Sequence, residues 1–396
     1  MKRGSRISHA YKWWHQQGAI SVRRLHLTST FPPSKAGDSP TTLHFSWRGF
    51  FFDNPSHAMA DYAHHPAAED VPADDDSSSV SASSVDDSLV SLRSSILDYR
   101  RENGRTYHRL SDGKYMLPND EKEQDRLDLT HHLWLLTWDD ALCKCPKKDG
   151  AKRVLDIGTG TGIWALDYAD EHPEAIVLGV DLSPIQPDFV PPNCSFEVDD
   201  VEKDWTWVEP FDFIFIRSMI ASFSSWPDIL AKAYQSLEPG GYLELHDHML
   251  PLKCQDGTMA EDFKPYKWNN LLIEATNQIG RPINVPSTFK QMLEDAGFVD
   301  VEERIVTWPF NPWPKDPKLR DIGFWAQETA LAGIEAVSMA LFTRVLDWAP
   351  EEAWVFCAEV RNEHKKIGVH AYYDVYGVWG RKPEEEKDGN PEPGQA

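Results

Sequence analysis

The sequence lacks the features that mark several large classes of protein. It contains no apolar run near the roughly 20 residues that span a bilayer, so we expect no membrane-spanning helix. It has only five cysteines in 396 residues, an odd number that is too small to staple such a chain. This usage favours a reducing compartment. The Cys143-x-Cys145 pair lacks the spacing and the partner pair of a zinc site, and we expect no bound metal.

Basic residues are also few. Lys and Arg number 40 against 63 Asp and Glu, which gives a net charge of −23. A chain with this balance repels phosphate backbones and anionic lipid head groups, so we expect no direct nucleic-acid partner and no membrane partner.

Residues 1–37 differ from the rest of the chain, because they contain basic residues and no acidic one. That bias is shared with mitochondrial transit peptides. The alternatives are a disordered arm, or upstream sequence preceding a true start at Met59. The compartment therefore stays open: the cytoplasm or nucleus is favoured, and the mitochondrion is the alternative if the arm is a true presequence.

Composition divides the chain into three parts. Residues 66–90 are acidic, rich in Ser and poor in large apolar residues, and residues 383–396 have the same character. Such segments bury too little apolar surface to offset the entropy of ordering. We therefore predict a disordered region over residues 1–90, one folded domain with an N-terminal helical cap over residues 91–382, and a disordered tail over residues 383–396.

Within the folded part, short apolar runs alternate with helical patterns. Runs rich in Val, Ile, Leu and Phe predict strands at residues 154–157, 176–180, 195–198, 211–216 and 242–245. Helices are predicted from residue 120 and at residues 287–296, 318–346 and 351–366. The stretches at residues 299–310 and 369–382 could supply two last strands, as a hairpin at the edge of the sheet. Nearly continuous apolar strands are typical of a parallel sheet buried on both faces, so the predicted fold class is α/β.

A glycine turn follows the first of these strands. Asp156 ends the strand, and Gly158, Gly160 and Gly162 form the turn before a helix. Glycine tolerates positive φ and lets a ligand approach the backbone closely. A strand, a glycine turn and a helix N-terminus form the corner that recognises nucleotides in doubly wound sheets.

Spacing indicates which nucleotide binds. A dinucleotide fingerprint needs a glycine where this chain has Ile163, which disfavours a nicotinamide-dependent oxidoreductase. A nucleoside with an amino-acid tail, such as S-adenosylmethionine, would use Asp156 to attract its ammonium group. Asp181 follows at the distance of an acid that accepts hydrogen bonds from ribose hydroxyls. After the third strand, Asp199 or Asp200 could accept from the adenine amino group.

The chain resembles the class I S-adenosylmethionine-dependent methyltransferases, and within them the fungal LaeA-like group. The matching stretches include "RTYHRLSDGKYMLPNDEKEQDRLDLTHH", "VLDIGTGTGIWALDYADEHPEAIVLGVDLSPIQPDFVPPN" and "SSWPDILAKAYQSLEPGGYLELHD", within about residues 105–382. The resemblance implies a Rossmann-like, seven-stranded, mostly parallel sheet with an antiparallel edge strand and helical insertions. The candidate cofactor-binding residues are Asp156, Gly158, Thr159, Gly160 and Gly162 for the methionine part, Asp181 with Leu182 for the ribose, and Asp199, Asp200 and Val201 for the adenine.

The resemblance also implies a function with two forms. The first is an S-adenosylmethionine-dependent methyltransferase of fungal secondary metabolism that acts on a small metabolite or a protein. The alternative is a nuclear regulator of secondary-metabolite genes, in which the fold mainly binds partners of the velvet type.

Catalytic candidates follow the fourth and fifth strands. His246 and Asp247 could form a general base with its orienting carboxylate, with His248 as a weaker choice, and Arg217 could anchor an acidic acceptor. His131 and His132, in the helix before the sheet, are expected to be structural or lid residues.

Overall fold

The computed structural model describes residues 99–108 and 114–384. The basic arm, the acidic Ser-rich segment and almost all of the C-terminal tail lie outside these residues. No helix in the described part combines the length and the apolar character needed to cross a membrane.

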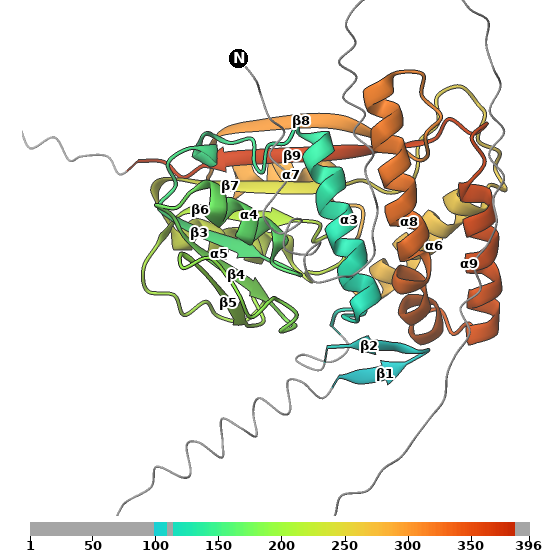
Figure 1. Ribbon diagram of the computed structural model, residues 1–396, viewed down its shortest axis with the longest axis horizontal. Coiled ribbons are helices and arrows are strands. Elements are labelled where there is room, and N and C mark those ends of the chain that lie inside the picture. The colour runs from blue at the N-terminus through green and yellow to red at the C-terminus, as the bar shows by residue number, and fades with distance from the viewer. Residues whose placement is uncertain (1–98, 109–113, 385–396) are drawn as a thin grey trace, which may run out of the picture.

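The centre of the molecule is a seven-stranded sheet (Figure 1). Its spatial order is β5-β4-β3-β6-β7-β9-β8. The strands are β3 (Arg153–Ile157), β4 (Ile176–Asp181), β5 (Cys194–Val198), β6 (Phe211–Arg217), β7 (Leu237–His248), β8 (Val299–Pro309) and β9 (Tyr372–Arg381). Strand β9 pairs antiparallel with both β7 and β8. The predicted α/β class and the mostly parallel, seven-stranded sheet are confirmed, and the antiparallel strand lies second from the edge, inside β8.

Strand β6 shows why polar and apolar residues do not alternate along a central strand of this sheet. Phe213 and Phe215 pack on one face of the sheet, against Trp164. Ile214 and Ile216 point to the opposite face, because successive side chains of a strand alternate. Both faces of the strand are therefore buried, and the run is apolar throughout.

Helices cover both faces. Helix α4 (Ile163–Glu171) packs on the face that carries Phe213 and Phe215. Helices α5 (Trp226–Ser236) and α7 (Phe289–Asp295) pack on the opposite face. Short 3₁₀ turns η1 (Pro146–Lys148) and η2 (Pro286–Thr288) precede β3 and α7.

A second helical layer lies beyond one end of the strands, next to the end of β8 and the start of β9 (Figure 1). It consists of α6 (Lys264–Gln278), α8 (Pro317–Arg344) and α9 (Pro350–His364), which share one apolar core with Trp308 of β8 and Val375 of β9 (Figure 1). The sequence patterns predicted α8 and α9, whereas α6 lies in a stretch that they left as an insertion. Since α8 and α9 connect β8 to β9, these two paired strands are neighbours in space but are far apart in the chain.

Helix α3 (Glu121–Thr137) passes between the sheet and α8 (Figure 1). It begins after Asp120, whose carboxylate accepts from the backbone N–H of Glu123 at 3.1 Å. Arg105 donates to the same carboxylate at 2.8 Å from the small hairpin of β1 (Arg100–Glu102) and β2 (Arg105–Tyr107). This cap joins the hairpin to the helix, and the helix reaches the carboxyl ends of the parallel strands through Trp134, which donates to Ser218 at 3.0 Å.

Candidate functional site

The glycine turn after β3 is held against the neighbouring strand. Gly158 and Thr159 donate their backbone N–H groups to the carbonyl of Val180 at 2.9 and 3.0 Å. Gly158, Gly160 and Gly162 adopt φ values of 71°, 60° and 80°, a region that other residues rarely occupy. The turn thus presents bare backbone at the carboxyl edge of the sheet, where α/β folds bind ligands.

Two carboxyl groups flank this turn, a buried one on Asp156 and a partly exposed one on Asp181. Asp156 accepts from the Thr159 hydroxyl at 2.6 Å. Asp181 accepts from the backbone N–H groups of Gly160 at 2.9 Å and Ser183 at 3.0 Å, with Leu182 between them. Burial raises the pKa of Asp156 and of Asp181 to about 6. A cationic ligand placed beside them would favour their ionised forms.

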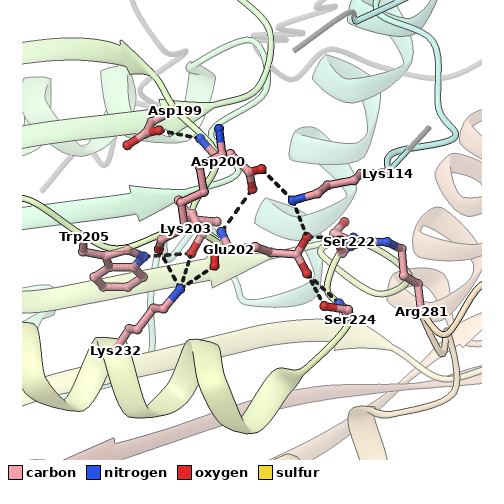
Figure 2. A network of polar contacts seen from close by, with 11 residues as sticks. Lys114, Asp199, Asp200, Glu202, Lys203, Trp205, Ser222, Ser224, Lys232 and Arg281 are labelled. Atoms are coloured by element: carbon pink, nitrogen blue, oxygen red, sulfur yellow. Dashed lines mark hydrogen bonds and ion pairs between the residues drawn. The ribbon is translucent and has the colours of Figure 1, made fainter. Parts of the chain in front are cut away.

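A network of ion pairs surrounds the end of β5 (Figure 2). Lys114 donates to Asp200 at 2.7 Å and lies 3.5 Å from Glu202. Glu202 accepts from Arg281 at 2.7 Å and from the Ser224 hydroxyl at 2.6 Å. Although burial alone would raise it, these hydrogen bonds hold the pKa of Glu202 at about 2. The network joins the end of β5 to the segment before α3 through Lys114, to the loop after β6 through Ser224, and to the turn after α6 through Arg281.

The other predicted adenine-site residues lie beside this network. Asp199 accepts from the backbone N–H of Asp200 at 2.7 Å. The carbonyl of Val201 accepts from the indole of Trp205 at 2.9 Å.

The loop after β6 approaches the glycine turn. Ser218 and Ala221 adopt φ values of 58° and 62°, an uncommon conformation for residues with a side chain. Between them, Met219 packs against the turn so closely that a Cβ on Gly158 would lie 2.1 Å from its Sδ. The backbone N–H of Ile220 donates to Asp247 at 2.9 Å, which ties this loop to the end of β7.

The predicted pairing of His246 with Asp247 is wrong. His246 is 1% exposed and its Nε2 lies 2.6 Å from Glu244, while its ring packs against Trp134 and Phe215. Asp247 points to the other face, because neighbouring residues of a strand alternate. Its carboxylate lies 3.4 Å from Nδ1 of His248 instead.

Glu244 also lies next to Cys143 and Cys145, and it holds the loop that carries them. Its carboxylate and the thiols of Cys143 and Cys145 lie within 4.8 Å of one another, all buried. However, the carboxylate already accepts from the backbone N–H groups of Lys144 at 2.7 Å and Cys145 at 2.8 Å. We interpret Glu244 as the anchor of this loop on β7.

Arg217 lies at the end of β6, next to the cap helix. Its Nη2 donates to Nδ1 of His131 at 2.9 Å, and Nε2 of His131 lies 3.0 Å from Asp167 of α4. Burial lowers the pKa of Arg217 to about 10, against the opposing effects of Asp156 and Asp167. His131 therefore connects α3 and α4 to a guanidinium at the strand edge.

Sequence reasoning missed several residues of this site. Lys114 and Arg281 reach the β5 end from segments 86 and 79 residues away, and no local pattern marks either one. Met219 follows an apolar strand and has no special spacing. The orientation of His246 could have been predicted from the sequence, because neighbouring residues of a strand point to opposite faces of the sheet, which places His246 and Asp247 on different faces.

Comparison with known proteins gives a consistent set of relatives. A family model described as a methyltransferase domain matches residues 124–303. The chain is 41% identical over 300 residues to "Methyltransferase pytC" of Aspergillus terreus, covering 76% of this chain and 93% of that protein. It is 38% identical over 291 residues to "Secondary metabolism regulator LAE1" of Cochliobolus heterostrophus, covering 72% and 95%. It is 37% identical over 290 residues to "Protein-methionine methyltransferase laeA" of Emericella nidulans, covering 72% and 77%.

Proposed function

Because the chain belongs to the LaeA-like group of S-adenosylmethionine-dependent methyltransferases, we propose that its cofactor binds along the carboxyl edge of the sheet, across the glycine turn. In this proposal Asp156 and residues 158–162 hold the methionine part. Asp181 with Leu182 holds the ribose, and Asp199, Asp200 and Val201 hold the adenine. The cofactor supplies an electrophilic methyl group on a sulfonium, and the chain's residues bind and align it.

Asp181 is the observation that carries the proposal. Its two oxygens accept from Gly160 and from Ser183, so one carboxylate is bonded both to the glycine turn and to the loop after β4. Each carboxylate oxygen can accept further hydrogen bonds, such as those of two ribose hydroxyls. The raised pKa of Asp181 and Asp156, about 6 in each case, supports a site that gains from a positively charged ligand.

Calorimetry with S-adenosylmethionine tests the cofactor site. The wild type should bind, and Asp181→Ala should weaken binding about 10–100-fold, the loss typical of hydrogen bonds to a charged group. Asp188→Ala, an exposed carboxylate in the loop after β4, is the matched control and should bind like the wild type. A wild type that does not bind the cofactor, or an Asp181→Ala variant that binds like it, would contradict the proposal.

Alignment should supply most of the catalysis. Methyl transfer is an in-line displacement at the sulfonium methyl, and fixing both reactants contributes several of the roughly 7–11 kcal/mol available from orientation. His246 is fully enclosed and hydrogen-bonded to Glu244, so we no longer propose it as the base. Asp247 is equally buried and accepts from the backbone N–H groups of Ile220 and His248, so we propose that it orients the loop after β6 beside the glycine turn.

A second candidate function is regulatory. One relative, LAE1, is named as a secondary metabolism regulator, and another, laeA, is named as a protein-methionine methyltransferase. The second name favours a protein acceptor. From the resemblance to the LaeA-like group we also propose a velvet-type partner and a nuclear location. The net charge of −23 supports a regulator that does not itself bind nucleic acid or membranes.

Complementation separates the two functions. A strain lacking the gene can be given the Asp181→Ala variant, in which cofactor binding should be about 10–100-fold weaker, once thermal unfolding has shown that the variant folds. Loss of secondary metabolites in that strain would show that methyl transfer is the biological role. Full restoration would instead favour partner binding.

A further inference from the structure

We propose that Arg217 binds the α-carboxylate of S-adenosylmethionine, held in place by His131 and Asp167. This inference rests on the cofactor position proposed above. It differs from the role predicted for Arg217 in the sequence, which was to anchor an acidic acceptor.

The sheet register places Arg217 beside the glycine turn. Asp156 of β3 pairs with Phe215 of β6, and Arg217 follows two residues later on the same face. Asp156 is also the first charged neighbour that opposes the lowered pKa of Arg217. An acid and a guanidinium thus stand at the ends of adjacent strands, on one face of the sheet.

The guanidinium of Arg217 is fixed but largely unused. Within residues 99–108 and 114–384, its one hydrogen-bond acceptor is Nδ1 of His131 at 2.9 Å, although a guanidinium carries five N–H donors. The ring of Phe215 lies 5.8 Å from its central carbon. The side chain is only partly buried, so its other N–H groups remain available to a ligand at the strand edge.

His131 sets the direction in which Arg217 points. Because Arg217 donates to Nδ1, that nitrogen carries no proton, and Nε2 must donate to Asp167, which lies 3.0 Å away. His131 belongs to α3 and Asp167 to α4, so two helices orient one side chain. We assign His131 and Asp167 as positioning residues and Arg217 as the ligand-binding residue.

The chemistry of the ligand matches this pair of charges. The methionine tail of the cofactor ends in an ammonium group and a carboxylate, which carry opposite charges. Asp156 suits the ammonium, and arginine suits a carboxylate because its planar fork can donate two parallel hydrogen bonds. An acidic acceptor is the competing ligand for Arg217, and it can be excluded by measuring binding without any acceptor present.

The test compares two ligands that differ in the amino-acid tail. S-adenosylhomocysteine has the carboxylate, whereas 5′-methylthioadenosine keeps the adenosine and the thioether and lacks the tail. Calorimetry on the full chain should show that Arg217→Met weakens S-adenosylhomocysteine about 10–100-fold and changes 5′-methylthioadenosine less than about threefold. Arg217→Lys keeps a positive charge, so its affinity for S-adenosylhomocysteine should fall less than that of Arg217→Met.

Arg304→Met serves as the matched control. Arg304 is an exposed arginine on β8, where it lies over Trp379, and its loss should leave both affinities unchanged. Retained binding of 5′-methylthioadenosine by the Arg217 variants also shows that they are folded.

Two outcomes would overturn the inference while the cofactor site survives. Arg217→Met could bind S-adenosylhomocysteine as the wild type does, or it could lose both ligands equally, which would mean a structural role. A wild type that binds neither ligand would instead refute the proposed cofactor position, and the inference with it.

Discussion

At the scale of single residues, the site depends on the absence of a side chain at Gly158. The space where its Cβ would lie is filled by Sδ of Met219, at 2.1 Å, and its φ of 71° disfavours any side chain. A residue with a side chain would therefore strain the backbone and displace Met219, which packs against the turn.

Gly158→Ala should lower cofactor affinity at least about tenfold, and it should cost about 1–2 kcal/mol of stability through its backbone conformation. Gly257→Ala is the matched control, because Gly257 has a φ of 73° and nothing within 4 Å of the added Cβ. That control should lose similar stability and keep its affinity. Calorimetry and thermal unfolding of both variants check this, and equal affinities in the two variants would contradict the account.

Some residue roles were predictable and others were not. The acids at three strand ends and the three glycines are marked by local spacing, because each follows its own apolar run. The partners of His246 could have been anticipated from strand alternation. The two residues of positive φ in the loop after β6, Ser218 and Ala221, carry no such mark, since their side chains do not favour that conformation.

At the scale of elements, the end of α9 contains a buried histidine that makes the protein sensitive to acid. His364 is 1% exposed, stacks on Phe310 at 3.9 Å, and neither ring nitrogen has a hydrogen-bond partner within the described residues. Its carbonyl accepts from Gln327 of α8 at 2.9 Å, so the helix end is fixed while the ring stays neutral. Burial lowers the pKa of this ring to about 3.

This shift predicts how stability depends on pH. An unfolded histidine takes up a proton below about pH 6.5, whereas folded His364 does so only near pH 3. Stability should therefore be complete above pH 6.5 and fall by up to ~1.4 kcal/mol per unit as pH drops toward 3. In His364→Phe this part of the loss should vanish. Thermal unfolding at pH 7 and pH 5 compares the two proteins, and an unchanged difference in the variant would refute the assignment.

Helices also differ in how well the sequence predicts them. Helices α8 and α9 repeat apolar residues at helical spacing, and they were predicted within a few residues of their ends. Helix α6 was missed because it begins with Lys264 and Pro265 and mixes Asn269 and Asn270 with its apolar residues. Asn269 is buried nonetheless, where its side chain accepts from the backbone of Leu252 at 2.9 Å. A buried polar residue of this kind removes the periodicity on which sequence reasoning depends.

At the scale of the whole molecule, the centre of the sheet was predictable because β3, β4 and β6 are buried on both faces. The arrangement around the cofactor edge was not, because it depends on contacts between distant segments. Lys114 and Asp200 are 86 residues apart in the chain, and Trp134 and Ser218 are 84 apart. The division into residues 1–90, 91–382 and 383–396 stays a prediction.

The central claim is that the carboxyl edge of the sheet seats the cofactor between the glycine turn and the three acidic strand ends. A crystal structure of the complex with S-adenosylhomocysteine tests it most directly. We predict the ribose hydroxyls on Asp181, the adenine beside Asp200, and the tail between Asp156 and Arg217. A nucleoside bound elsewhere, or one that makes no contact with Asp181, would contradict the account.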